Sequence, residues 1–507
     1  MRHFFFVWML VVAPLLHQSC EHPAPAFQQG EALALTHCST CHTFPDPSLL
    51  DQNTWKNIVL PRMGILMGHL PEDSAGGIFY EPELKSLILQ NPGIWRESSA
   101  LSQQEWSDIR NYYLKAAPPS VPMLTQPIDT HLLLFEVKFP DLFADPPGTS
   151  LVQFSGNQCY YGDIHSEKLF RLDQKLLPQG ILNIPGGPVH LTQLEEGQLI
   201  TAIGSFTPSD QSSGSILFVP KDASAALTLI DQLKRPVHTS VGDLDQDGLF
   251  DLVICEFGKW AGSLNWWKND GKGHFEKKLL RNMPGAISTI ISDLNGDRLP
   301  DIVALFGQGD EGIFLYENLG QGNFNEKRLL SFPPSYGSSF FQLSDFDQDG
   351  LPDILYTCGD QADFKPVLKP YHGIRWYKNT GNYQFEEVFF YPLPGAYGAV
   401  MEDFDQDGDL DAAAISFFPD YHSAKPLGFV YLENLGNGRP FKARTFPQVD
   451  KGRWMLLHPG DYDADGDIDL ILGNLSFPTV PEKNWENTWQ KFGIPFLILE
   501  NQLVQHK

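Results

Sequence analysis

Two cysteines and a histidine near the N-terminal end have the spacing of residues that hold a metal cofactor. Cys38, Cys41 and His42 form the pattern C-x-x-C-H. Two thiols about one helical turn apart can each form a thioether with a vinyl group of the same porphyrin, and the adjacent imidazole can then ligate the iron. In an exported chain this pattern is typical of haem attachment. The sequence therefore predicts one haem c, with His42 as the proximal iron ligand.

The same residues have two other interpretations. A redox-active C-x-x-C pair requires a βαβ context, whereas the residues that follow Cys41 are rich in proline. A zinc site would require two further ligands at close spacing. We therefore favour haem over both.

A second iron ligand is expected downstream, because His and Met ligation is common in electron-transfer haems. Residues 59–68 read VLPRMGILMG and contain Met63 and Met67, and His69 follows them. The order C-x-x-C-H-T-F-P-x-P, then Trp55, then V-L-P-x-M-G resembles small class-I-like c-type cytochromes. The resemblance implies that Met63 is the distal ligand, with Met67 and His69 as alternatives.

A helix is predicted to complete this first domain. Residues 102–105, SQQE, have the form of a capping box at a helix N-terminus. Apolar residues then recur at helical spacing, at Trp106, Ile109, Tyr112 and Tyr113. We expect a small all-α cytochrome c domain over residues 27–117, followed by a proline-rich linker over residues 118–130.

Five acidic segments recur in the second half of the chain. Each has Asp or Asn at its first, third, fifth and ninth positions, and four of the five have Gly at the sixth position. Their first residues are 50, 52, 58 and 58 residues apart, and a period near fifty indicates a propeller or a solenoid. The residues concerned are Asp243, Asp245, Asp247, Asp251, Asp293, Asn295, Asp297, Asp301, Asp345, Asp347, Asp349, Asp353, Asp403, Asp405, Asp407, Asp411, Asp461, Asp463, Asp465 and Asp469.

Oxygen ligands at alternate positions of a tight loop suit Ca²⁺. The alternative is a solvated acidic turn, but bunched carboxylates repel one another unless a cation compensates them, and here the arrangement recurs five times. We predict up to five structural calcium ions. The loop at Asp293 is the weakest candidate, because Arg298 replaces the Gly and Asn295 replaces a carboxylate.

Each acidic loop precedes an apolar run that predicts a buried strand, such as residues 252–254, and then a hairpin turn. Residues 235–502 resemble the FG-GAP or VCBS repeats of integrin-α-like propellers, whose loops carry calcium. Two further units without acidic loops, near Thr149 and Val189, bring the expected number of blades to seven, over residues 131–503. Ring closure would then pair residues 132–139 with residues 496–500. The expected fold is therefore multidomain: a small all-α cytochrome c domain, then an all-β propeller.

The N-terminus predicts export. A charged start at residues 1–3 precedes an apolar run over residues 4–16, which is too short to span a bilayer. Ser19 before Cys20 resembles the end of a bacterial lipoprotein signal, although His17 stands where an aliphatic residue is usual. The resemblance implies cleavage after residue 19 and lipidation of Cys20, with plain cleavage as the alternative. We expect the protein in the periplasm or at the cell surface, with the lipid as its membrane anchor.

The charge and the remaining cysteines limit the possible partners and cross-links. A net charge of −26 argues against binding to nucleic acid or to anionic lipid headgroups. Cys159, Cys255 and Cys358 are expected to be buried thiols, with one disulfide among them as the alternative.

These features predict an electron-transfer protein whose propeller docks a redox partner protein, a membrane electron carrier or a substrate. Two alternatives stay open: an extracellular dehydrogenase that uses the haem as its electron outlet, and a calcium-dependent adhesion protein that binds an extracellular glycan or protein. The sequence contains no nucleophile elbow, zinc motif or nucleotide fingerprint. We therefore expect an electron carrier or binding protein rather than a stand-alone enzyme, and assign no catalytic residue.

Overall fold

The chain divides into two compact units in a computed structural model that describes residues 25–69, 101–124, 126–221, 225–362, 367–436, 441–476 and 483–503. One unit contains the residues up to His37 and Gln52–Ala116, and the other contains Cys38–Asp51 and Ala117–Lys507. The predicted signal over residues 1–19 and the lipidation candidate Cys20 lie outside the described residues. None of the described helices has the length and apolar character needed to cross a membrane.

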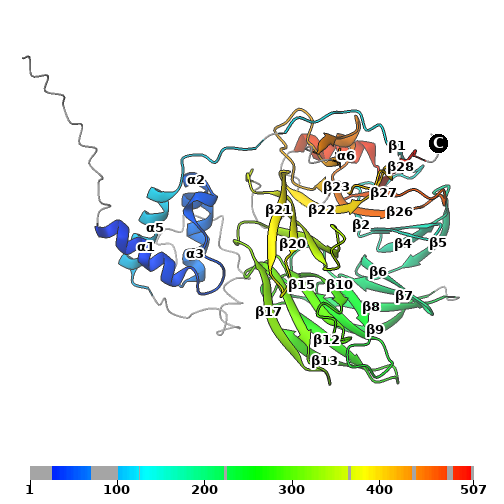
Figure 1. Ribbon diagram of the computed structural model, residues 1–507, viewed down its shortest axis with the longest axis horizontal. Helices are drawn as coiled ribbons and strands as arrows, with labels where there is room; N and C mark the ends of the chain where they lie inside the picture. Colours follow the sequence, from blue (N-terminus) through cyan, green and yellow to red (C-terminus); the bar gives the residue numbers. More distant parts are fainter. Residues whose placement is uncertain are drawn as a thin grey trace, which may run out of the picture. The chain divides into compact units, whose positions relative to one another are not determined.

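The first unit is helical (Figure 1). Its elements are α1 (Pro25–His37), α2 (Gln52–Thr54), a π-helical turn (Trp55–Val59), α3 (Leu60–Leu66) and α5 (Gln103–Ala116). The predicted capping box opens α5: the backbone N–H of Ser102 donates to Glu105 Oε2 at 2.7 Å, and that of Glu105 donates to Ser102 Oγ at 3.2 Å. The predicted apolar stripe of α5 is buried, at Trp106, Ile109, Tyr112 and Tyr113.

Two glycines allow these helices to pack closely. A Cβ at Gly30 would lie 2.3 Å from the carbonyl oxygen of Asp108, so α1 and α5 meet backbone against backbone. A Cβ at Gly64 would lie 2.9 Å from the ring of Trp106, so the glycine that follows Met63 is required by the packing of α3 against α5. The motif V-L-P-x-M-G thus has a packing reason for its last residue.

The second unit contains a seven-bladed β-propeller in which every blade is a four-stranded antiparallel sheet (Figure 1). The first two blades comprise β2 (Thr149–Ser155), β3 (Gln158–Asp163), β4 (Lys168–Leu172) and β5 (Pro178–Asn183), then β6 (Pro188–Leu194), β7 (Gly197–Ala202), β8 (Ser212–Pro220) and β9 (Leu227–Lys234). The third and fourth comprise β10 (Pro236–Gly242), β11 (Asp251–Glu256), β12 (Ser263–Asn269) and β13 (Phe275–Arg281), then β14 (Ala286–Ser292), β15 (Asp301–Phe306), β16 (Gly312–Asn318) and β17 (Phe324–Ser331).

The other three blades follow the same order. They comprise β18 (Ser338–Ser344), β19 (Asp353–Cys358), β20 (Gly373–Asn379) and β21 (Phe385–Pro392), then β22 (Ala396–Glu402), β23 (Asp411–Ser416), β24 (Phe429–Glu433) and β25 (Lys442–Arg444), and last β26 (Trp454–Gly460), β27 (Asp469–Asn474), β28 (Phe496–Asn501) and β1 (Phe135–Lys138). A short helix, α6 (Lys483–Phe492), lies between β27 and β28 in the chain. The prediction of seven blades is confirmed.

The last blade closes the ring with strands from both ends of the propeller segment. β1 pairs antiparallel with β28, with Phe135 opposite Asn501, and the two strands lie side by side in Figure 1. This is the closure predicted from residues 132–139 and 496–500. Ahead of β1, Asp129 in the expected linker forms an isolated bridge with Arg444, and its backbone N–H donates to the Ala443 carbonyl at 3.0 Å.

The second strand of each blade that follows an acidic loop is buried along its whole length, because neighbouring blades cover both of its faces. A strand buried on both faces reads as a continuous apolar run, which is the pattern that predicted these strands. Cys159, Cys255 and Cys358 are buried as expected, and they are thiols that form no disulfide.

Ring closure should depend on Phe135. Its side chain is buried at 5% exposure against Phe404 and Tyr431, with ring centroids 5.7 and 5.5 Å away. We expect Phe135→Ala to lower the free energy of unfolding by about 3–4 kcal/mol, the usual cost of truncating a buried Phe. Urea denaturation followed by tryptophan fluorescence measures this. Leu133→Ala is the control, because Leu133 is 74% exposed, and an equal loss in both variants would contradict the closure role.

Candidate calcium loops, haem segment and histidine pocket

The five acidic loops connect the first and second strands of the third to seventh blades. In the loop that begins at Asp243, this carboxylate accepts the backbone N–H groups of Asp247 at 3.1 Å and Gly248 at 2.9 Å. The first aspartates of the loops at Asp345, Asp403 and Asp461 make the same pair of contacts. Each first aspartate therefore holds its own loop in a tight turn.

The sixth position of these loops requires a left-handed backbone. The four glycines there have φ between 87° and 96°, and nothing lies within 4 Å of an added Cβ at any of them, so the glycine is needed for its φ and not for space. In the loop at Asp293, Arg298 adopts φ 72° at the same position. An L-residue in this region costs about 1–2 kcal/mol.

Carboxylate oxygens converge in four of the five loops. In each group below, one ligand atom of every residue lies within 4.8 Å of the others. The groups are Asp243, Asp245 and Asp251; Asp345, Asp347 and Asp353; Asp403, Asp405 and Asp407; and Asp461, Asp463 and Asp465. The loop at Asp293 forms no such group within the described part of the chain, and there Asn295 Nδ2 donates to Asp297 at 2.9 Å.

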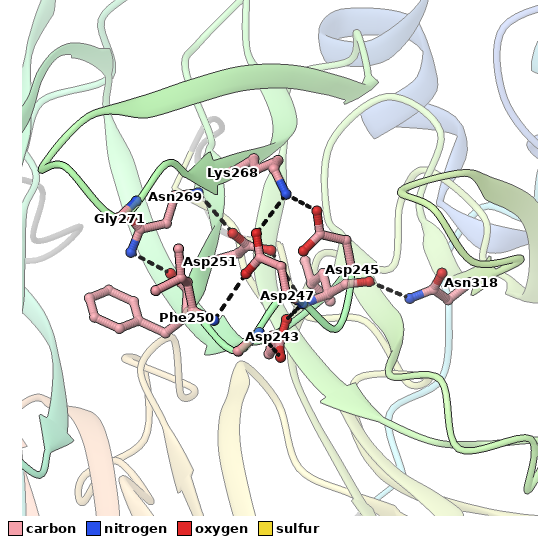
Figure 2. Close-up of polar contacts among 12 residues, drawn as sticks. Asp243, Asp245, Asp247, Phe250, Asp251, Lys268, Asn269, Gly271 and Asn318 are labelled. Carbon is pink, nitrogen blue, oxygen red and sulfur yellow. Dashed lines mark hydrogen bonds and ion pairs between the residues drawn. The ribbon is translucent and has the colours of Figure 1, made fainter.

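The ninth aspartate of each loop has a structural role that the sequence did not predict. Asp251 is fully buried, and its Oδ1 accepts the backbone N–H of Asn269 at 2.8 Å (Figure 2). The Asn269 side chain returns a hydrogen bond to the Phe250 carbonyl at 3.0 Å and accepts the Gly271 N–H at 2.9 Å. This Asp–Asn clamp joins the acidic loop to the hairpin turn of its own blade.

The clamp recurs with nearly the same geometry in all five blades. The ninth aspartates are at most 1% exposed, and each accepts the N–H of an asparagine at 2.7–2.8 Å. The other pairs are Asp301 with Asn318, Asp353 with Asn379, Asp411 with Asn434, and Asp469 with Asn501. Burial raises the pKa of Asp411 to about 7 and that of Asp469 to about 8.

The C-x-x-C-H residues belong to the second unit, and Met63 belongs to the first. Cys38 is half-buried and Cys41 is exposed, and no disulfide joins them. His42 Nδ1 lies 2.9 Å from the carbonyl oxygen of Thr43, which can only accept, so Nδ1 carries the proton and the lone pair lies on Nε2. A histidine that ligates a metal through Nε2 commonly donates its other ring N–H in this way, so this contact and the two thiols are compatible with haem attachment.

The three distal-ligand candidates lie in the helical unit. Met63 is half-buried in α3, and Met67 caps the end of the same helix. The His69 ring stacks on Trp106 with centroids 5.6 Å apart, and its Nδ1 contacts Gln103 Oε1 at 3.2 Å. His69 therefore already has a packing role.

Three histidines on the first strands of blades form a cluster that sequence analysis missed. The rings of His190 and His238 have centroids 4.1 Å apart. A cavity of about 290 Å³ is lined by His190, His458 and apolar side chains that include Leu151 and Leu456. The repeated dipeptide Val-His at residues 189–190 and 237–238 was the available signal for two of these histidines.

These imidazoles are held neutral. The Nδ1 atoms of His238 and His458 accept backbone N–H groups at 3.4 Å, which requires a lone pair on Nδ1. Burial lowers the pKa of His190 and of His458 to about 4, and that of His238 well below its usual value.

Comparison with protein-family models agrees with the predicted repeat. The family model of the FG-GAP-like repeat matches residues 243–304 and 293–356, which contain the first three acidic loops. These residues are FG-GAP repeats, and they belong to the seven-bladed propeller described above.

Among solved structures, the N-terminal domain of Nup159 is similar over 75% of this chain and 99% of that one, with 10% identity and a TM-score of 0.43. A luciferin-regenerating enzyme matches 56% of this chain and 88% of its own, with 10% identity and a TM-score of 0.35. An ancestral GH74 enzyme matches 66% and 45%, with 10% identity and a TM-score of 0.42. At this level of similarity they carry no argument about function.

Replacing Arg298 with Gly should stabilise the propeller. The left-handed φ at this position costs nothing for Gly, and after the extra entropy of Gly in the unfolded chain we expect a gain of about 0.5–1 kcal/mol. Urea denaturation measures the gain. Arg298→Gln is the control, because it removes the charge and keeps the strained backbone. A gain as large in Arg298→Gln would show that charge, and not φ, is responsible.

The histidine cluster should make the propeller less stable in acid. The unfolded chain binds protons on His190 and His458 below about pH 6.5, whereas the folded chain binds them only near pH 4, so the free energy of unfolding falls as the pH falls between these values. At pH 5 we expect a loss on the order of 1–2 kcal/mol per histidine. Urea denaturation at pH 7 and pH 5 should show a smaller loss in the variant His190→Gln/His458→Gln. Identical pH dependence in variant and wild type would contradict this role.

Proposed function

We propose that the chain is an exported haem-c electron-transfer protein whose calcium-stabilised propeller docks a redox partner. The observation that carries the proposal is the C-x-x-C-H segment, in which Nδ1 of His42 contacts the Thr43 carbonyl and Nε2 would be left to ligate the iron. Haem, when bound, would supply reversible exchange of one electron at its iron.

The residues of this segment would hold the haem in different ways. Cys38 and Cys41 would fix the porphyrin covalently, which requires both to be thiols. His42 would ligate the iron through Nε2, while its Nδ1–H remains bonded to the Thr43 carbonyl, and this contact fixes the ring orientation and raises the basicity of the ligand. Met63 would be the sixth ligand and would raise the reduction potential.

The propeller would provide the docking surface. Its acidic loops lie on the connections between first and second strands, and the whole chain carries a net charge of −26. Such a surface attracts partners with basic patches and accelerates their encounter at low ionic strength. A basic redox protein fits this charge better than an anionic membrane surface does. Lipidation at Cys20 would keep the protein at the membrane, within reach of a membrane electron carrier.

Calcium would act structurally in this proposal. Carboxylates that converge within 4.8 Å repel one another, and a bound cation would remove this repulsion and fix the connections between strands. The sites would hold the ring and would take no part in electron transfer.

The full-length protein from a host that matures cytochromes should be coloured. We expect a reducible c-type absorption spectrum, and haem that stays attached to the polypeptide after denaturation. His42→Ala should disturb the spectrum, and Cys41→Ser should reduce covalent attachment. A colourless wild-type protein from such a host would exclude the haem role and leave a calcium-dependent binding propeller.

Met63→Ala should lower the midpoint potential, because the thioether stabilises the reduced iron. Met67→Ala is the matched control and should leave the potential unchanged. The reverse result would assign Met67 as the distal ligand.

A further inference from the structure

The inner wall of the propeller is made of the first strands of the seven blades. These strands contact one another around the ring, from β2 with β6 round to β26 with β2. The cavity of about 290 Å³ lies on this wall, between the first strands of the seventh, first and second blades. Its lining contains none of the acidic-loop residues and none of the C-x-x-C-H residues.

One histidine of this wall differs from the other two. His238 Nδ1 accepts the backbone N–H of Thr289 at 3.4 Å, and His458 Nδ1 accepts that of Phe154 at 3.4 Å. Each of these rings is therefore tied to the first strand of the next blade. His190 has the position equivalent to His238, directly after the register shift in its strand. Its buried Nδ1 nevertheless has no hydrogen-bond partner among the described residues.

A second polar group on the wall is also unpaired. Gln153 lines the cavity from β2, and its amide forms no hydrogen bond with a described residue. Polar groups inside native proteins are nearly always hydrogen-bonded, because leaving one unpaired is costly. We therefore expect the partner of His190 and Gln153 to come from outside the chain, as water or as a bound molecule.

The rest of the lining favours an organic molecule over water. The apolar side chains of the cavity are Leu151, Val152, Val189, Leu191 and Leu456. A buried water needs two to four polar partners, and an apolar wall offers none. A volume of about 290 Å³ would hold on the order of ten water molecules, which is too many for three polar side chains to bind. One small organic molecule would fill the same space and cover the apolar side chains.

The lining also limits the charge of the ligand. Among the described residues, no charged side chain lines the cavity, and the low pKa of His190 and of His458 keeps both imidazoles neutral. An ion would lose its hydration there without gaining a counter-charge. An amide both donates and accepts hydrogen bonds, and so does a neutral imidazole through its two nitrogens. Hydroxyl groups on an apolar ring meet both requirements.

A transition-metal ion fits this cavity less well. Because Nδ1 of His238 and of His458 accepts a backbone N–H, the proton of each neutral ring lies on Nε2. Neither ring then has a free lone pair, which leaves His190 as the only imidazole able to bind a metal.

We propose that this cavity is a binding site for a small uncharged ring compound with one or two hydroxyl groups, the chemistry of a phenol, and that His190 recognises a hydroxyl. His190 and Gln153 would bind the hydroxyl groups, and the leucine and valine side chains would contact the ring. His190 would thus gain the hydrogen bond that the chain does not supply. The site depends neither on haem nor on calcium, so its failure would leave the proposed function unchanged.

Calorimetric titration of the full-length protein at pH 7 tests the site, with phenol and resorcinol as probes. Toluene has nearly the shape of phenol and lacks the hydroxyl, so we expect it to bind at least about tenfold more weakly. Glucose tests for a polyol site and Zn²⁺ tests for a metal site, and we expect neither to bind in the cavity.

Two variants, His190→Leu and Gln153→Leu, remove one polar group each and keep the cavity apolar. Each should weaken the binding of phenol about tenfold, because one hydrogen bond to the hydroxyl is lost. His274→Leu is the matched control, since it makes the same change at a side chain that is 82% exposed in a hairpin turn. It should bind phenol as the wild type does.

The stability of the ligand-free protein provides a second readout. His190→Leu removes an unpaired buried imidazole nitrogen, so it should raise the unfolding midpoint in urea. The same variant should lose the increase in midpoint that phenol causes in the wild type. A lower midpoint in ligand-free His190→Leu would show that the ring is needed for packing against His238, and would overturn its role in recognition.

The other outcomes also decide the inference. If neither phenol nor resorcinol binds the wild type at millimolar concentration, the inference is overturned and the cavity holds water. Equal binding of phenol and toluene, or an equal loss in His274→Leu, would overturn the role of His190. Tighter binding of glucose or of Zn²⁺ in the cavity would overturn the ligand class. If His190→Leu does not fold, Gln153→Leu and the four probes decide.

Discussion

The propeller depends on one repeated interaction, the hydrogen bond from a clamp asparagine N–H to a buried aspartate. In the third blade, Asp251 accepts from Asn269, so the start of the second strand is fixed to the end of the third. A buried carboxylate is costly unless donors satisfy it. Asp251 has two backbone donors, Asn269 and Leu244, and the second lies within the acidic loop. The loop conformation and the blade register are therefore specified together.

This clamp has an electrostatic cost, because it brings negatively charged carboxylates close together. Fixing the ninth aspartate also fixes the loop before it, which brings the carboxylates of the first and third positions near one another. The repulsion grows as the site is buried, because the local dielectric constant falls. Lysine at the end of the third strand compensates part of this charge, at Lys268 and Lys378, and a bound divalent ion would do so in the proposed function.

The sequence was sufficient to predict the number and order of the blades. It was not sufficient to predict the contacts between residues that lie far apart in the chain. The count of seven and the closure of β1 on β28 followed from local periodicity, because each blade repeats one pattern. The clamp role of Asp251 depends on a partner in a hairpin turn that was read only as a turn. The histidine pocket joins strands from the second and seventh blades, at His190 and His458, and only ring closure brings these together. The repeated Val-His dipeptide marks two of the clustered histidines, but it does not show which strands ring closure brings together.

The proposed function would combine two kinds of metal chemistry that do not compete. Thiols and imidazole, at Cys38, Cys41 and His42, are ligands for iron in a porphyrin, whereas the loops offer only hard oxygen donors that suit calcium. Covalent attachment would prevent the haem from exchanging, so its retention would not depend on the calcium concentration. In this proposal the ring that docks a partner would respond to calcium, and the centre that carries the electron would not. Calcium in the surroundings would therefore control docking and leave the potential of the haem unchanged.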